Sequence, residues 1–135
     1  MRLIPSLVAV AAVVACSDAF SPTIDNVAGE YTLDQLTTVT DTGGTKNWVA
    51  AGATFTISLG TNGTTTGQLF IPEGGAGGVD FNADMAGTWT LTDGIVGFDQ
   101  TADSFVRDYL FSARENRLAA DRNDPGIRVI VVLRK

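Results

Sequence analysis

The sequence contains no histidine, a single cysteine and fewer basic than acidic residues. Without histidine, the commonest general base is missing, and so are Ser-His-Asp or Cys-His catalytic groups and any histidine-ligated metal site. A single cysteine excludes an intramolecular disulfide. The net charge of −6 argues against binding to nucleic acid. A binding protein is therefore favoured over a catalyst.

Residues 1–15 have the pattern of a signal peptide. Arg2 precedes an apolar run from Leu3 to Ala15 that is interrupted only by Pro5 and Ser6. This run is shorter than the roughly 20 apolar residues that a membrane-spanning helix needs, but it suits the core of a secretion signal. We therefore expect residues 1–15 to be removed from the mature protein.

The only cysteine ends this segment. Val13-Val14-Ala15-Cys16 resembles the lipobox of bacterial lipoproteins. The resemblance implies that Cys16 is the lipidated N-terminus of a protein anchored in the cell envelope, and Ser17 implies the outer membrane, on its periplasmic side. Two alternatives stay open. Either the protein is secreted and Cys16 is removed with the signal or left as a free thiol, or Cys16 is a buried structural cysteine.

The mature chain divides into a tether and one domain. Residues 16–26 comprise the lipidated cysteine and a short polar tether broken by Pro22. A flexible coil of this length would span roughly 18 Å and would hold the domain close to the membrane. Residues 27–135 are enough for one modest domain with a hydrophobic core.

This domain has the alternation of apolar and polar residues that is typical of β-strands. Asn62-Gly63 and Asp93-Gly94 separate alternating runs and predict tight hairpins, because their residues tolerate positive φ. Longer loops are expected at 41–46 and 73–78, and one helical turn at 101–106. The predicted strands cover 27–34, 53–59, 67–71, 87–92, 95–100, 107–113, 117–121 and 127–134.

About eight short antiparallel strands, mostly joined as hairpins, predict an all-β fold. We expect a small up-and-down β-barrel, because a closed barrel leaves no exposed strand edges. A two-sheet sandwich is the alternative.

Three segments resemble small bacterial lipocalin-like lipoproteins. VAGEYTL (27–33) contains Gly29-Glu30-Tyr31, in which tyrosine replaces the tryptophan of the family's Gly-x-Trp motif. MAGTWTLTDGIVGFDQ (85–100) resembles the family's glycine–aromatic strand and hairpin, and FVRDYLFSARENRLAADR (105–122) continues the pattern. The resemblance implies a lipocalin-like barrel whose candidate ligand is a small apolar molecule held inside.

Inward-facing positions of such a barrel are the candidate ligand-lining residues. Residues at such positions are more often the plain core of a filled barrel, since an eight-stranded barrel can be filled by its own side chains. Trp48 is a separate candidate for contact with a ligand or partner at the surface. The candidate lining residues are Tyr31, Phe55, Ile57, Leu69, Trp89, Leu91, Phe98, Tyr109, Phe111, Val129 and Val131.

Catalytic and metal sites have little support. Asp99, Asp103 and Asp108 are close in sequence but flank a turn, where we expect solvated surface carboxylates. The run from Asp80 to Asp84 imitates the start of a calcium loop, but Met85 stands where that loop needs glycine. We expect no catalytic residue, no metal and no cofactor.

Two functions of different classes follow. The first is a non-enzymatic, lipid-anchored envelope barrel that binds a small apolar ligand. The second is an envelope protein-interaction or inhibitor module with a filled core, acting through Trp48 and the arginines between 107 and 128. A hydrolase is disfavoured because no general base is apparent.

Overall fold

The computed structural model describes residues 19–135, so the predicted signal peptide and Cys16 lie outside the described residues. None of the helices in this part of the chain is long and apolar enough to span a membrane. In chain order the elements are α1 (Ile24–Val27), β1 (Gly29–Thr40), β2 (Thr45–Asn47), β3 (Thr54–Leu59), β4 (Thr64–Ile71), η1 (Ala76–Gly78), β5 (Phe81–Asp84), β6 (Gly87–Thr92), β7 (Ile95–Gln100), α2 (Phe105–Asp108), β8 (Phe111–Arg114), β9 (Arg117–Asp124) and β10 (Ile127–Arg134).

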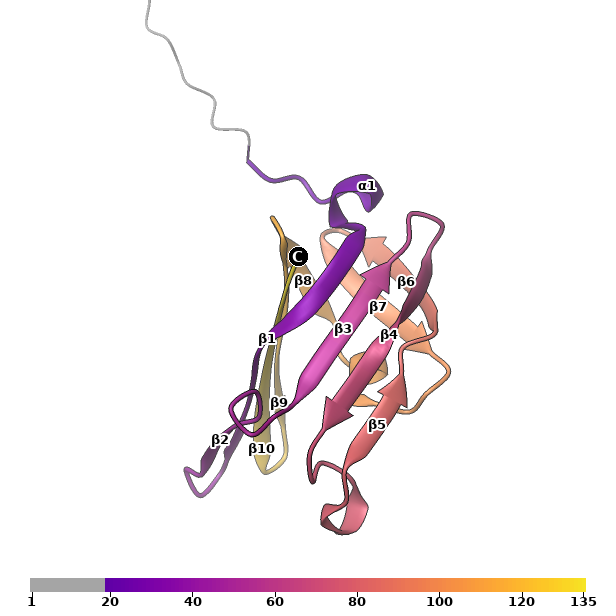
Figure 1. Cartoon of the computed structure of the whole chain (residues 1–135). Helices are drawn as coiled ribbons and strands as arrows, with labels where there is room; N and C mark the ends of the chain where they lie inside the picture. The colour runs from indigo at the N-terminus through magenta and orange to yellow at the C-terminus, as the bar shows by residue number, and fades with distance from the viewer. Residues whose placement is uncertain (1–18) are drawn as a thin grey trace, which may run out of the picture.

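Eight of the strands close into an antiparallel barrel (Figure 1). Around the barrel the order is β1, β3, β4, β6, β7, β8, β9 and β10, and β10 pairs with β1 along its length to close the ring. β2 pairs with one end of β1, and β5 pairs with the half of β4 that β6 leaves free. The prediction of a closed, antiparallel, all-β barrel is confirmed, and residues 19–135 form this barrel and not the alternative two-sheet sandwich.

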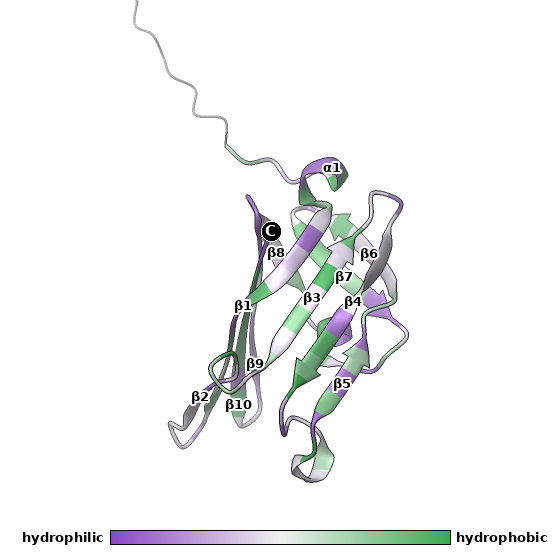
Figure 2. Ribbon diagram, in the orientation of Figure 1, coloured by the Kyte–Doolittle hydropathy of each residue, from purple (hydrophilic) through white to green (hydrophobic). Residues whose placement is uncertain are grey.

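Alternating side chains fill the barrel. In β3, Phe55, Ile57 and Leu59 are buried whereas Thr54 and Thr56 are exposed. In Figure 2, β3 accordingly alternates between green, hydrophobic residues and paler ones. Successive side chains of a strand point to opposite faces, so one set packs inside and the other meets water. Fully burying an apolar side chain of this size contributes about 1.5–3 kcal/mol.

Both predicted hairpin turns form where the sequence places Asn-Gly and Asp-Gly. Gly63 has φ 85°, and Asp93 and Gly94 have φ of 50° and 76°. One other glycine is required by close approach of two strands. A Cβ on Gly67 would lie 2.0 Å from the carbonyl oxygen of Thr56 on β3, so only glycine allows β3 and β4 to pair here.

The predicted strand at 107–113 is wrong in its first half. Residues Phe105–Asp108 form α2, and β8 begins only at Phe111. Val106 is fully buried in the core, and Arg107 pairs at 2.6 Å with Asp103, which lies two residues before α2. β8 therefore shares only two register pairs with β7, and α2 packs against β7 instead.

Several further boundaries differ from the prediction. β4 begins at Thr64 and not at Gly67. β1 continues to Thr40, and the expected loop at 41–46 is only the tight turn into β2, whose Lys46 faces Thr38 of β1. β9 extends to Asp124 because it pairs with β10 over its full length. Pairing with β10 extends both β1 and β9 beyond the segments in which apolar and polar residues alternate.

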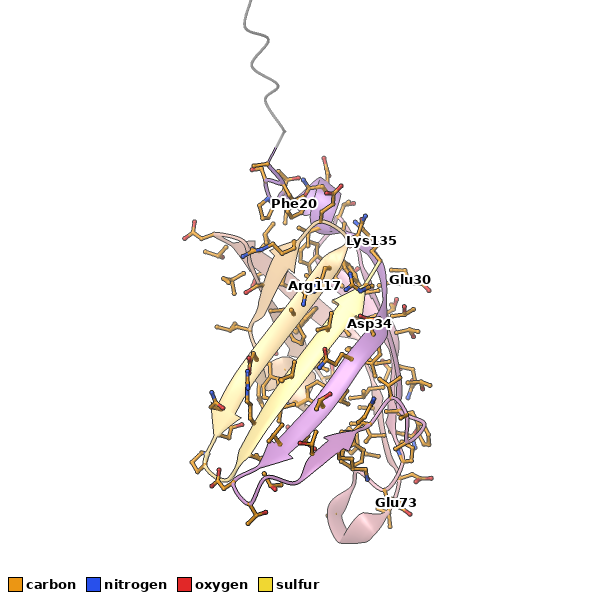
Figure 3. The ribbon with its side chains drawn as sticks, turned by 90° about the vertical axis from the view of Figure 1, so that its left-hand side faces the viewer. Phe20, Glu30, Asp34, Glu73, Arg117 and Lys135 are labelled. Atoms are coloured by element: carbon orange, nitrogen blue, oxygen red, sulfur yellow. The ribbon has the colours of Figure 1, made fainter. Side chains whose placement is uncertain are left out.

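The expected tether up to Asn26 is instead folded over one end of the barrel in its described part (Figure 1). Thr23 and Asn26 form a reciprocal cap on α1, with Asn26 Oδ1 accepting from the Thr23 amide at 2.7 Å. Phe20 packs against the core, as its place beside α1 in Figure 3 illustrates. The flexible spacer that we expected from the sequence therefore cannot include residues 20–26.

This closed end is fixed by bonds to backbone carbonyls. The hydroxyl of buried Tyr31 donates to the carbonyl of Val27 at 2.6 Å. The ammonium group of Lys135, at the last residue of the chain, donates to the carbonyls of Asn26 and Ala28 at 2.7 and 2.8 Å. The segment around α1 and the C-terminal residue are thus joined over the same opening of the barrel.

Candidate functional site

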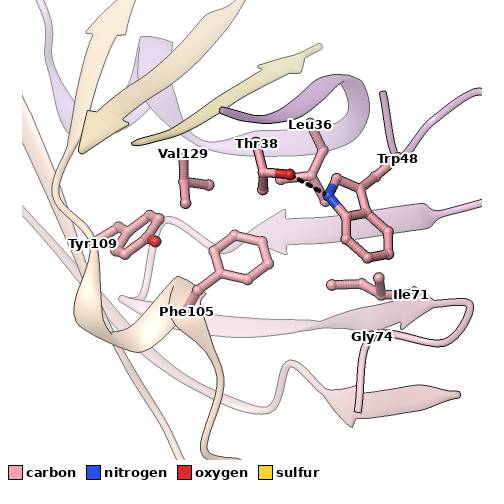
Figure 4. Close-up of a pocket in the computed structure, with 8 residues that line it drawn as sticks. All are labelled: Leu36, Thr38, Trp48, Ile71, Gly74, Phe105, Tyr109 and Val129. Carbon is pink, nitrogen blue, oxygen red and sulfur yellow. Dashed lines mark hydrogen bonds between the residues drawn. The ribbon is translucent and has the colours of Figure 1, made fainter. Parts of the chain in front are cut away.

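An apolar pocket lies toward the opposite end of the barrel from α1. Its volume is about 150 Å³, and it opens to solvent between β1, β10, α2 and the segment that follows β4. Figure 4 shows the aromatic rings facing one another across it. The lining residues are Leu36, Thr38, Trp48, Ile71, Gly74, Phe105, Tyr109 and Val129.

Trp48 is held in place by three interactions. Its backbone amide donates to the carbonyl of Leu36 at 2.9 Å, which ties the residue to β1. Its indole N–H donates to the hydroxyl of Thr38 at 3.0 Å (Figure 4). The ammonium group of Lys46 lies 3.7 Å from the centroid of the indole ring, a cation–π contact. The half-buried indole is therefore a fixed wall of the pocket.

Phe105 and Tyr109 form the facing wall. Both belong to the turn around α2, where the amide of Tyr109 donates to the carbonyl of Phe105 at 3.0 Å. Their ring centroids are 5.4 Å apart and the ring planes are inclined by 48°. The helical turn that displaces the expected strand thus positions both rings.

The phenol of Tyr109 stays protonated at neutral pH. Burial raises its pKa above the ordinary value of 10.0, and the nearby carboxylate of Asp124 raises the pKa further. The guanidinium of Arg122 lowers the pKa, and Asp108 raises it. A neutral hydroxyl therefore accompanies an otherwise apolar wall.

The eleven predicted lining residues lie in two different environments. Tyr109 and Val129 line the pocket, and Trp48, predicted as a surface contact, forms its wall. The other nine do not line this pocket. Leu91 is half-buried against the core, and the remaining eight are buried in it: Tyr31, Phe55, Ile57, Leu69, Trp89, Phe98, Phe111 and Val131.

Strict alternation along the sequence does not predict Leu36 and Thr38 as lining residues, because a bulge in β1 changes which face of the strand each residue occupies. The register with β10 shifts between Leu33 and Gln35, so the inward positions change from odd-numbered residues such as Tyr31 to even-numbered ones. Asp34 and Gln35, two successive polar residues, are the only sequence signal of this change.

The arginines of the C-terminal half are mostly paired within the molecule. Arg134 bonds Asp34 at 2.8 Å, Arg122 bonds Asp124 at 2.9 Å, and Arg128 bonds Asp121 and lowers the pKa of that carboxyl. These pairs, two across neighbouring strands and one within β9, therefore account for much of the basic character that the sequence concentrates here. Such exposed pairs contribute little stability, because water and salt screen their attraction.

Residues 19–135 contain no group of three or more acidic or cysteine side chains placed to hold a metal ion. Of the carboxylates considered for catalysis, Asp99 is exposed, and Asp103 and Asp108 lie on either side of Arg107, at 2.6 and 3.8 Å from its guanidinium nitrogens. The pocket lining itself carries no carboxylate, amine or thiol. What the pocket offers chemically is apolar contact and two hydroxyl groups.

Comparison with protein-family models, with curated proteins and with solved structures finds no match to this chain. The fold and the pocket define a class by geometry alone: a closed eight-stranded antiparallel barrel that is sealed at one end and bears an apolar pocket toward the other.

Proposed function

We propose that this protein is a non-enzymatic, lipid-anchored barrel of the bacterial cell envelope that binds a small apolar molecule at its open end. The observation that carries the proposal is the pocket between Trp48 and the Phe105–Tyr109 pair. Ligand sites are mostly apolar hollows with a few placed polar groups, and aromatic side chains are common in their walls.

The size of the pocket limits what it holds. A cavity of about 150 Å³ matches those that accept a single benzene ring in apolar protein interiors. The packed core beneath it, with Leu69, Val131 and Leu133 fully buried, leaves the ligand near the mouth of the barrel. The proposed ligand is therefore a ring or short chain, or that part of a larger molecule.

The anchor in this proposal rests on the resemblance of residues 13–16 to a lipobox. Phe20, four residues after Cys16, is folded against the closed end. A lipid on Cys16 would hold that end toward the membrane and direct the pocket away from it. The barrel would then meet ligands from the aqueous side.

The absence of an enzymatic role is also part of the proposal. Thr38 accepts the indole N–H of Trp48, and the raised pKa of Tyr109 keeps its phenol protonated, so neither hydroxyl is an activated nucleophile. Binding without turnover is the activity that this lining supports.

The two tryptophans allow a direct test by NMR. We expect propylbenzene, added to the ¹⁵N-labelled full chain carrying Cys16→Ala, to shift the indole N–H resonance of Trp48. The resonance of Trp89 should stay in place, because that indole is buried and donates to the carbonyl of Gly60 at 2.8 Å. Trp48→Phe assigns the two signals.

Two matched variants serve as filler and control. Ile71→Phe adds volume inside the pocket and should weaken binding about tenfold or more. Ile95→Phe makes the same change on β7, where the side chain is 37% exposed, and should leave binding unchanged. Failure of every apolar compound to move the Trp48 signal would contradict the proposal and favour the alternative of a surface-acting interaction module.

The anchor has its own test. The mass of the mature protein from bacterial membranes should exceed that of the chain beginning at Cys16 by two or three acyl groups. Cys16→Ala should lose this increment and leave the membrane fraction. An unmodified mature mass would contradict lipidation but would not bear on ligand binding in the pocket.

A further inference from the structure

A second hollow, the outer groove, lies on the outside of the barrel across β8, β9, β10 and β1. Its volume is about 380 Å³. Along β9 its floor is Ala119, a small residue between the longer side chains of Arg117 and Asp121, which also line it. One row of residues in cross-strand register runs through the groove: Ser112, Ala119, Val132 and Gln35.

The floor of the outer groove is apolar. Val132 is only 3% exposed, although it is not part of the core that Val131 and Leu133 help to form inside the barrel. Neighbouring side chains on the outer face therefore cover it, and Ile130 beside it is half-buried. Leu110, at one end of the groove, is 70% exposed. An alkyl chain laid along this floor would remove further apolar surface from water, which is favourable.

An uncompensated positive charge borders the same groove. Arg114, Arg117 and Arg134 lie directly opposite one another on β8, β9 and β10. Like charges in such cross-strand positions are destabilising. Arg134 is compensated by Asp34 on β1, at 2.8 Å, whereas Arg117 forms no ion pair within residues 19–135. Figure 3 shows Arg117 on this face, with Asp34 further across the sheet.

The Arg117 side chain lies against the sheet. Its Nε is buried and has no hydrogen-bond partner among the described residues, so a ligand would meet the terminal nitrogens of the guanidinium and not Nε. Terminal guanidinium N–H groups match the two oxygens of a carboxylate. Asp121, further along β9, is already bonded by Arg128 and leaves Arg117 uncompensated. One free guanidinium calls for a single negative charge.

We infer that the outer groove binds an amphipathic carboxylate. The carboxylate pairs with the terminal nitrogens of Arg117, and the alkyl chain lies over Ala119 and Val132 toward Leu110. Arg117 and Asp121 are four residues apart on β9, or about 13 Å along a strand, which leaves room for a chain of the length of octanoate. This site is separate from the pocket beside Trp48 and does not depend on the proposed function.

Three compounds with one alkyl chain test the inference: octanoate, octanol and octylamine, each titrated into the ¹⁵N-labelled full chain carrying Cys16→Ala. Octanoate should shift the backbone amide signals of Ala119 and Val132 and bind more tightly than octylamine. Arg117→Gln should weaken octanoate binding about tenfold, the usual worth of a hydrogen bond to a charged group, and leave octanol binding unchanged. Arg122→Gln is the matched control on β9, because that guanidinium is held by Asp124 outside the groove, and it should leave octanoate binding unchanged.

A second variant tests the apolar floor without altering charge. Ala119→Leu adds volume inside the outer groove and should weaken both octanoate and octanol about tenfold. Unchanged binding of both compounds would overturn the inference even if Arg117→Gln did not fold.

Three other results would overturn it. If octanoate moves only the Trp48 indole signal, it binds in the other pocket, and the proposed function stands without this inference. Equal weakening by Arg117→Gln and Arg122→Gln, or equal affinity for octylamine and octanoate, would remove the role of Arg117. If the Ala119 and Val132 signals move with protein concentration alone, a second copy of the chain covers the groove in place of a carboxylate ligand.

Discussion

The two ends of the barrel are built from different kinds of residue. At the closed end, Val27 and Tyr31 are almost fully buried, and the backbone carbonyls around α1 are bonded by the phenol of Tyr31 and the ammonium of Lys135. At the open end, Trp48 and Phe105 are half-buried, and no covering segment lies over them within residues 19–135.

The difference shows where the chain seals its core. Residues from both ends of the described chain meet over one opening, so the two hydrogen bonds of Lys135 that help to close it join residues more than a hundred positions apart. The other opening is bordered by turns and α2, which are local in sequence. The aromatic rings at this opening form the walls of the pocket but do not cover it.

Truncation of a ring at each end should measure this contrast. We expect Tyr31→Ala to lower the free energy of unfolding by about 3–5 kcal/mol, because it leaves a cavity and an unbonded Val27 carbonyl. Phe105→Ala at the open end should cost about 1 kcal/mol, since its ring is already partly exposed beside a hollow. Urea unfolding of both variants, followed by far-ultraviolet circular dichroism, gives the two values.

Equal losses in the two variants would contradict the contrast, because they would mean that the open end is packed as tightly as the closed one. Tyr31→Phe is the control for the ring. It removes only the hydroxyl and should cost about 1–3 kcal/mol, the penalty of one unsatisfied carbonyl.

The barrel itself was predictable because its signals are local and repeated. Strict alternation in 53–59 and the turns at Asn62-Gly63 and Asp93-Gly94 each determine a conformation from a few neighbouring residues. Closure of the ring by β1 and β10 follows once every strand has a partner and no edge is left.

The pocket was much less predictable, since its walls depend on exceptions to alternation. Leu36 and Thr38 face inward only because of the bulge after Leu33, and Phe105 reaches the site only because 105–108 is helical. Period-two reasoning placed the buried rings in the interior but could not separate Tyr109, at the open end, from Tyr31, at the closed end. That distinction comes from α2 and from the chain ends.

These two tyrosines, the only ones in the sequence, allow the finest comparison of the ends. Burial alone raises the pKa of Tyr31, whereas the raised pKa of Tyr109 also depends on Asp124, Arg122 and Asp108. Because the folded protein keeps both phenols protonated to higher pH than the unfolded chain does, the free energy of unfolding should fall as the pH rises above 10.0. At neutral pH the effect is absent, which makes it the smallest of the expected changes.

Salt and ligand should separate the two titrations. About 1 M salt reduces the Debye length to about 3 Å, so it should lower the pKa of Tyr109, where the carboxylates outweigh the guanidinium, and leave that of Tyr31 unchanged. Propylbenzene should raise the pKa of Tyr109 alone, because a ligand beside this ring removes water from it. Tyrosinate absorbance of Tyr31→Phe and Tyr109→Phe, each with one remaining phenol, measures the two pKa values separately. Equal responses of both phenols to salt and to propylbenzene would mean that the two ends of the barrel do not differ in their access to solvent and ligand.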